Sequence, residues 1–97
     1  MRKMKKKTND EYRITMVFSL KNKVGALLDA LRPFKKDNIN LTRIISRPHE
    51  LKESQYTFFI EIEGSKNDPR VREALKELKK HTTSLYILGS YPLKKVR

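Results

Sequence analysis

The amino-acid sequence predicts an α+β domain in which strands and helices follow one another in the order β-α-β-β-α-β. Three features indicate this order. Apolar and polar side chains alternate in strand-like stretches, apolar residues recur at helical spacing in two other stretches, and glycine, proline and asparagine mark the boundaries. A chain of 97 residues is long enough for one domain with one core. We therefore expect a ferredoxin-like fold, with a four-stranded antiparallel sheet and both helices on one face.

The first half of the chain is predicted to form a strand, a helix and a second strand. In Tyr12–Leu20, apolar residues occupy every second position and the positions between them are polar except for Val17, as expected of a strand with one face on a core. Val24–Asp37 has leucines at helical spacing, but Pro33 lies inside this stretch and predicts a kink or an early end. Ile39–Arg47 is the expected second strand, ended by Pro48 because proline cannot donate to a strand ladder.

The second half is predicted to form a strand, a helix and a final strand. Gln55–Glu63 alternates like the first strand, and the polar loop before it is the expected tip of a hairpin. Asp68 is a preferred N-cap residue and Pro69 suits the first position of a helix, so the two together predict a helix start. Ser84–Tyr91 is the expected last strand. Its two faces carry Leu85 and Ile87 on one side against Tyr86 and Leu88 on the other.

The net charge of +12 is concentrated at the two ends of the chain. Residues 1–10 and 94–97 hold eight of the 23 basic side chains and one of the 11 acidic ones, which leaves a net charge of +5 for the body. We therefore expect residues 1–11 and 94–97 to be basic, flexible tails and residues 12–93 to be the folded domain. A solvated tail explains this charge more simply than a nucleic-acid-binding arm does.

The composition argues against several classes of protein. There is no cysteine, no apolar run approaches the roughly 20 residues that span a bilayer, and no apolar segment follows the charged N-terminus. We therefore expect a cytoplasmic protein with no disulfide and no membrane partner. His49 and His81 have no acid or histidine at metal-ligand spacing, and no nucleophile is paired with a base. We expect no metal, no cofactor and no enzymatic activity of the chain by itself.

The turn before the first helix is the candidate functional site. The first amides of a helix have no partner inside the helix, and the helix dipole favours an anion beside them. Gly25 allows a ligand to approach the backbone closely, so the N–H groups of Gly25, Ala26 and Leu27 suit a small anion such as a carboxylate. Taken alone, however, Gly25 is more simply explained as a turn glycine.

Three short motifs give this turn a family resemblance. Val24-Gly25-Ala26-Leu27, then Asn40-Leu41-Thr42, then Ser46-Arg47-Pro48 resemble the hallmark motifs of the ACT domains of prephenate dehydratases and aromatic amino acid hydroxylases. The ending Leu88-Gly89-Ser90-Tyr91-Pro92 is more similar to the dehydratases. The resemblance implies a ferredoxin-like regulatory domain that forms a homodimer. It also implies that L-phenylalanine, or less well another aromatic amino acid, binds at the dimer interface, as in feedback control of aromatic amino acid biosynthesis.

The resemblance also implies a set of ligand-binding residues. They are Val24, Gly25, Ala26, Leu27, Asn40, Leu41, Thr42, Ile45, Ser46, Arg47 and Pro48. Amides at the helix start would hold the ligand carboxylate, and carbonyls around Asn40 and Leu41 of the second copy would accept from the ligand ammonium. The family usually has glutamate before Ser-Arg-Pro, where this chain has Ile45.

Two other kinds of function stay open on the sequence. Ile45 stands where the family usually has a carboxylate directly before the third motif, and its absence favours a ligand-free dimerisation module or a docking module for a separate catalytic subunit. The element order is also that of RNA-recognition sheets, and the basic charge favours contacts with phosphates. However, Phe58 is expected in the core, and Phe59 shares the opposite sheet face with Glu61 and Glu63. Because these carboxylates would repel a phosphate backbone, nucleic acid is the least favoured partner.

Overall fold

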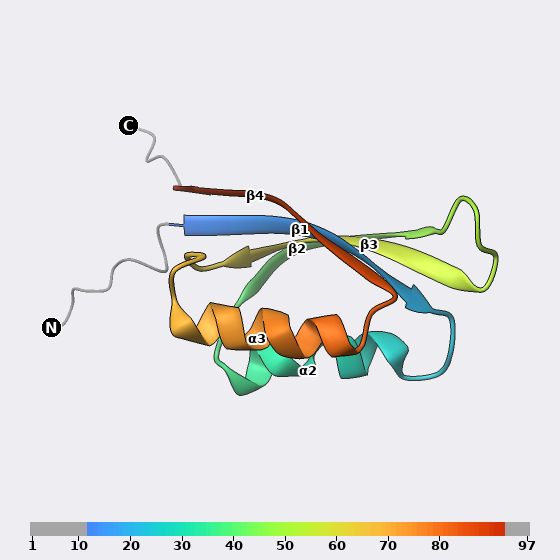
Figure 1. The fold of residues 1–97 in the computed structure, drawn as a ribbon, viewed down its shortest axis with the longest axis horizontal. Coiled ribbons are helices and arrows are strands. Elements are labelled where there is room, and N and C mark those ends of the chain that lie inside the picture. The colour runs from blue at the N-terminus through green and yellow to red at the C-terminus, as the bar shows by residue number, and fades with distance from the viewer. Residues whose placement is uncertain (1–11, 93–97) are drawn as a thin grey trace, which may run out of the picture.

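The computed structural model describes residues 12–92 and contains six regular elements (Figure 1). They are β1 (Tyr12–Lys21), α2 (Ala26–Lys36), β2 (Leu41–Pro48), β3 (Gln55–Glu63), α3 (Pro69–Lys80) and β4 (Ser84–Pro92). The predicted order β-α-β-β-α-β is confirmed. The two predicted tails, residues 1–11 and 94–97, and residue 93 of the predicted domain lie outside the described residues.

The four strands form one antiparallel sheet in the order β2-β3-β1-β4, which is the strand order of a ferredoxin-like fold. Both helices lie on the same face of this sheet, and none of the six described elements covers the opposite face (Figure 1). We call the uncovered side the outer face. β1 and β3 are central, whereas β2 and β4 are edge strands, so each edge strand has one free side for pairing.

The core lies between the sheet and the two helices. Its buried apolar residues are Ile14, Met16, Phe18, Leu20, Ala30, Phe34, Ile39, Phe58, Ile60, Ile62, Val71, Ala74 and Leu78. The rings of Phe18 and Phe58, which are direct partners across β1 and β3, have centroids 5.6 Å apart. Phe58 is 7% exposed whereas Phe59 on the outer face is 39% exposed, so the predicted division of these two rings is confirmed.

Helix α2 begins later than the sequence pattern predicts. Gly25 has φ 80 and ψ −2, a left-handed conformation that stops the helix from extending back to Val24, so the helix begins at Ala26. At the other end, α2 continues through Pro33 to Lys36, so of the two predicted outcomes, a kink or an early end, the early end does not occur. Pro33 is buried against the core, and its carbonyl still accepts from the N–H of residue 37 at 2.9 Å.

Strand β2 also begins later than predicted, at Leu41 instead of Ile39. Ile39 is buried in the core, and its N–H donates to the carbonyl of Phe34 at 2.7 Å, which closes the end of α2 and leaves no ladder bond for Ile39. Asp68 is the N-cap of α3 as predicted, because its carboxylate accepts from the N–H of Arg70 at 2.8 Å.

A bulge breaks the alternation predicted for β4. Gly89 pairs with Thr15 and Ile87 pairs with Met16, so Leu88 is an extra residue with no partner on β1. Leu88 is 58% exposed and is directed onto the outer face, where it lines a cavity described below. Alternation predicts the strand but gives no sign of the bulge, because the bulge depends on pairing with β1.

Candidate ligand site

The expected ligand-binding residues lie at opposite ends of the domain. Gly25 and Leu27 begin α2 next to the end of β1, whereas Asn40 and Leu41 follow the far end of α2 (Figure 1). At 1.5 Å of rise per residue, α2 and its turns separate the two groups by roughly 20 Å. A free amino acid is far shorter than this. Within one chain, the two halves of the expected site therefore do not meet.

The amides at the start of α2 form the first half. The N–H of Ala26 donates to the carbonyl of Lys23 at 3.1 Å, so this amide is already occupied. In the part of the chain that the structure describes, no acceptor is recorded for the N–H groups of Gly25, Leu27 and Leu28. Two amides of the expected trio, those of Gly25 and Leu27, and the additional amide of Leu28 are therefore available to an anion at this helix end.

A small cavity of about 260 Å³ lies beside the start of α2. Its lining residues are Lys21, Lys23, Ala26, Asp29, Lys80, His81, Thr82 and Thr83. Three lysines and the negative Asp29 give this end a positive balance of charge, and Asp29 is itself paired with Arg32 at 3.4 Å. This end of the domain is therefore suited to a carboxylate.

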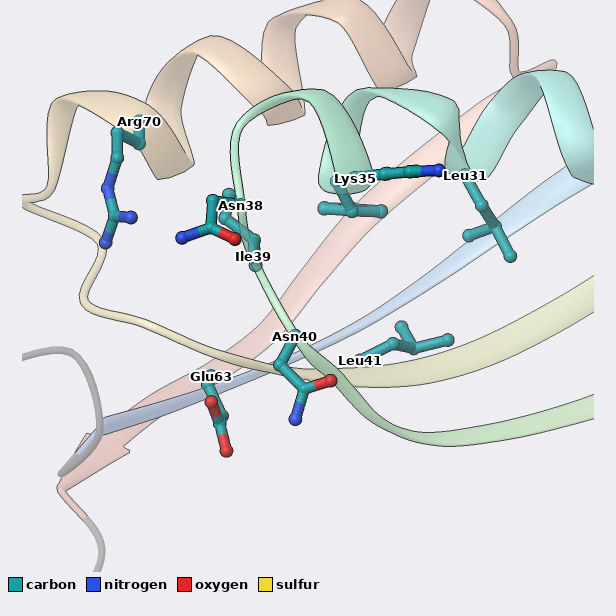
Figure 2. A pocket seen from close by; sticks show the side chains of 9 residues that line it. Leu31, Lys35, Asn38, Ile39, Asn40, Leu41, Glu63 and Arg70 are labelled. Carbon is teal, nitrogen blue, oxygen red and sulfur yellow. The ribbon is translucent and has the colours of Figure 1, made fainter.

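The second half of the site is a larger cavity of about 630 Å³ at the far end of α2 (Figure 2). Its lining residues are Leu31, Phe34, Lys35, Asn38, Ile39, Asn40, Leu41, Glu63 and Arg70. In Figure 2 the side chains of Asn40 and Glu63 lie on the sheet side of this cavity, and those of Lys35 and Arg70 come from the helices. The apolar and polar groups together suit a small molecule with an apolar body and a charged end.

Glu63 and Arg70 were not among the residues expected at the site. The N–H of Glu63 donates to the carbonyl of Asn40 at 2.9 Å, and a Glu63 carboxylate oxygen is 3.9 Å from Arg13. Because 3.9 Å is longer than a hydrogen bond, this ion pair leaves the Glu63 carboxylate able to accept a hydrogen bond from an ammonium group. The pairing of β2 with β3 brings Glu63 beside Asn40, and a prediction of this strand register would have identified Glu63 as a site residue.

Ile45 and Arg47 of the third motif do not lie in either half of the site. Ile45 is the direct partner of Phe59 across β2 and β3, and both side chains lie on the outer face. Arg47 is two residues further along β2 and therefore shares this face. Ser46 is the partner of the buried Phe58, so it lies on the side of the helices.

Thr42 and Pro48 also take positions away from the start of α2. Pro48 pairs with Tyr56, which in turn pairs with Leu20, so it lies at the same end of the sheet as Gly25 but two strands away. The Thr42 hydroxyl is instead part of a polar network on the outer face.

That network is centred on Glu61. One carboxylate oxygen accepts from the Thr42 hydroxyl at 2.8 Å, and the other accepts from the Tyr91 hydroxyl at 2.9 Å. Arg13 lies 3.9 Å from the same carboxylate. The hydrogen bond from Thr42, followed by that from Tyr91, lowers the pKa of Glu61, and the bond to Glu61 raises the pKa of Tyr91. The hydrogen bonds therefore stabilise the ionised form of Glu61 and the neutral form of Tyr91, and both carboxylate oxygens of Glu61 already have partners.

The two histidines have local structural roles. His49 Nδ1 accepts from the N–H groups of Leu51 and Lys52, at 3.1 and 3.2 Å, and so closes the hairpin loop. His81 is the C-cap of α3. Among residues 12–92, no three His, Cys, Asp or Glu side chains are grouped so that they could hold a metal ion. No helix within these residues has the length and apolarity needed to cross a membrane.

Comparison with known proteins identifies the family to which this fold belongs. A family model described as the ACT domain matches residues 14–80, and the chain belongs to this family. It is 50% identical over 78 residues to a bifunctional chorismate mutase/prephenate dehydratase of Aquifex aeolicus, covering 80% of this chain and 22% of that protein. It is 45% identical over 83 residues to a prephenate dehydratase of Methanocaldococcus jannaschii, covering 84% and 30%. The chain thus spans about a quarter of these relatives.

Solved structures give the same assignment. A prephenate dehydratase from Arthrobacter aurescens in complex with L-Phe superimposes with a TM-score of 0.75 and 35% identity, over 84% of this chain and 26% of that chain. A structure described as GqqA, a novel type of quorum quenching acylase, gives a TM-score of 0.83 and 29% identity, over 97% and 34%. The resemblance to the ACT domains of prephenate dehydratases, first seen in three motifs, is therefore confirmed over the folded domain.

Proposed function

We propose that this domain binds L-phenylalanine between two copies of the chain and acts as the amino-acid-sensing part of a prephenate dehydratase system. The observation that carries the proposal is the separation of two complementary half-sites. Free amides beside Gly25 suit a carboxylate, and the cavity that contains Asn40 and Glu63 suits an ammonium group and an apolar side chain. The match with a prephenate dehydratase in complex with L-Phe supports the choice of ligand.

A two-fold axis resolves the separation of roughly 20 Å between the half-sites. If α2 of one copy lies antiparallel to α2 of another, the Gly25 end of each copy meets the Asn40 end of the other. Such an interface uses the same surface twice and creates two equal sites. Each ligand would then contact both chains, so that binding and association stabilise each other.

Exposed apolar residues along α2 and β2 support this arrangement. Leu28 on α2 is 64% exposed, Val24 just before the helix is fully exposed, and Ile44 on β2 is also exposed. Leu31 and Leu41 line one cavity, so α2 and β2 border the same side of the domain. An apolar helix face beside an unpaired strand edge is the kind of surface that a second copy would cover.

The apolar lining of the larger cavity supports selection of an aromatic side chain. Leu31, Phe34 and Leu41 supply apolar surface there, and L-tyrosine or L-tryptophan would bind less well because each adds a polar group or extra bulk. In the proposed system, ligand binding at the interface would change the activity of a catalytic domain. That domain is not among the residues that the structure describes. Control of phenylalanine synthesis by its end product is the function that follows.

Thermal unfolding with each of the twenty amino acids tests the proposal. At a free concentration of 100 times Kd, a bound ligand adds about 2.7 kcal/mol. For a domain of this size we expect Tm to rise by about 10–20 °C with L-phenylalanine. D-phenylalanine is the matched control, because it has the same groups in a geometry that cannot serve both half-sites. Light scattering should give the mass of a dimer.

A set of melting curves that none of the twenty amino acids moves would contradict amino-acid sensing. A dimer without any ligand effect would then support a dimerisation or docking module. Ile45 in place of the family's usual glutamate is the residue that favours this second function, although it lies on the outer face.

A further inference from the structure

The outer face of the sheet carries a second cavity that the amino-acid site does not use. It has a volume of about 570 Å³ and lies across the four strands. Its lining residues are Thr15, Met16, Arg43, Ile45, Arg47, Phe59, Ile60, Glu61 and Leu88. We call it the outer-face cavity. Its size is within the range of small-molecule sites, and neither of the two helices in residues 12–92 covers it (Figure 1).

Three side chains give the cavity its apolar walls. Ile45 and Phe59 are direct cross-strand partners, and Leu88 lies on the same face as Tyr86, the partner of Val17 on β1. All three are partly exposed, so their apolar surface faces solvent. A flat ring laid against Phe59 would remove this surface from water.

The charged side chains at the cavity differ in whether they already have partners. Both oxygens of Glu61 are engaged by hydroxyls of Thr42 and Tyr91, and the charge of Arg43, its partner across the strands, also acts on it. No described side chain is recorded in a hydrogen bond or ion pair with Arg47. The cavity therefore offers a guanidinium to an incoming anion and no free carboxylate to an incoming ammonium group.

We propose that the outer-face cavity binds a small aromatic monocarboxylate that lacks an ammonium group. The ring would lie against Ile45, Phe59 and Leu88, and the carboxylate would pair with Arg47. Arg43 would contribute less, because Glu61 lies directly across from it and cancels part of its charge. The absence of an amino group in the ligand separates this site from the zwitterion site at α2. The proposal therefore stands whether or not the amino-acid site binds its ligand.

The probe that tests this proposal is 3-phenylpropionate, which is phenylalanine without its amino group. Amide NMR spectra of the ¹⁵N-labelled full chain are recorded with increasing probe. We expect the shifts to be largest at Ile45, Arg47, Phe59 and Leu88, with half-saturation at about 5 mM or below. 2-Phenylethylamine, which keeps the ring and the amine but has no carboxylate, should leave these signals unchanged.

Two variants and one control identify the groups responsible. Arg47→Gln should raise the half-saturation concentration about tenfold, because a charge-assisted hydrogen bond is lost. Ile45→Glu should raise it at least tenfold, because it sets a carboxylate in the cavity. Arg72→Gln on α3 is the matched control, since it removes an exposed arginine on the other side of the domain and should change nothing.

Two results would overturn the proposal. One is probe-induced shifts confined to Gly25–Leu28, which would assign the carboxylate to the start of α2. The other is equal half-saturation for Arg47→Gln, Arg72→Gln and the unchanged chain. Spectra of each variant without probe establish that it is folded. L-phenylalanine melting curves of Ile45→Glu separate the two sites, because affinity at α2 should persist while probe binding is lost.

Discussion

Replacement of Gly25 tests whether the start of α2 binds a ligand or serves only as a turn. Gly25 has φ 80, and a side chain added there would meet no described atom within 4 Å. Gly25→Val therefore costs folding only the strain of a branched residue in a left-handed conformation, about 1–2 kcal/mol. For a domain of this size, the expected fall in Tm without ligand is about 4–16 °C.

The effect on ligand binding should be larger than this loss of stability. The new side chain would occupy the open space beside the amides of Leu27 and Leu28, where the ligand carboxylate is expected. If Kd rises 100-fold, a ligand concentration that gave about 2.7 kcal/mol now gives about 0.4 kcal/mol. The rise in Tm caused by L-phenylalanine should then fall from about 10–20 °C to about 2–3 °C.

Gly25→Asn separates strain from obstruction in the same assay. Asparagine tolerates the left-handed conformation, so the variant should recover most of the stability that valine loses. Its side chain still fills the approach to the amides, so the ligand-induced rise in Tm should remain small. A full ligand response in Gly25→Asn would refute the reasoning, because Gly25 would then be required only for its backbone conformation.

Three further perturbations test the interface, the outer face and the core. Leu28→Glu should convert a dimer to a monomer in light scattering and change the free energy of unfolding of the monomer by less than about 0.5 kcal/mol; a persistent dimer would place the interface elsewhere. Tyr91→Phe should lower the free energy of unfolding at pH 7 by about 0.5–1 kcal/mol, because it removes a hydrogen bond to Glu61. The lowered pKa of Glu61 adds stability above about pH 4.5 that is lost in more acidic solution, and the raised pKa of Tyr91 adds stability below about pH 10 that is lost in more alkaline solution. Urea titrations should therefore show that the difference in free energy of unfolding between Tyr91→Phe and the original chain becomes smaller at pH 3 and above pH 10. A difference that does not change with pH would contradict this account. Gly64→Ala should cost about 2–5 kcal/mol, because Gly64 has φ 145 and the new methyl group would lie 2.7 Å from Val71 in the core; a Tm within 2 °C of the original would show that the backbone relaxes there.

Local patterns in the sequence were sufficient for most of the fold. The alternation of apolar and mostly polar residues identified β1 and β3, and it also assigned Phe58 to the core and Phe59 to the outer face. The Asp68-Pro69 pair fixed the start of α3. These features depend on neighbouring residues alone, through the period of a strand and the unpaired amides of a first turn, so they can be read along the chain.

The candidate site could be predicted only in part from such local patterns. The motif residues were recognised, but Arg47 and Ile45 belong to the outer face, and the amide of Ala26 is occupied by Lys23. Glu63 was missed because its place beside Asn40 follows from the pairing of β2 with β3, two strands that are read separately in the sequence. A motif names residues without giving the face of the sheet on which each one lies.

By itself, the sequence determined the order of the elements, the division of their faces and the membership of the ACT family. The tertiary structure alone decided that the two halves of the expected site lie at opposite ends of one chain, and that Ile45, Phe59 and Leu88 of three different strands border one cavity on the outer face. The physical reason is that periodicity and capping act over a few residues, whereas strand register and the distance along α2 are set by pairing and packing across the whole domain.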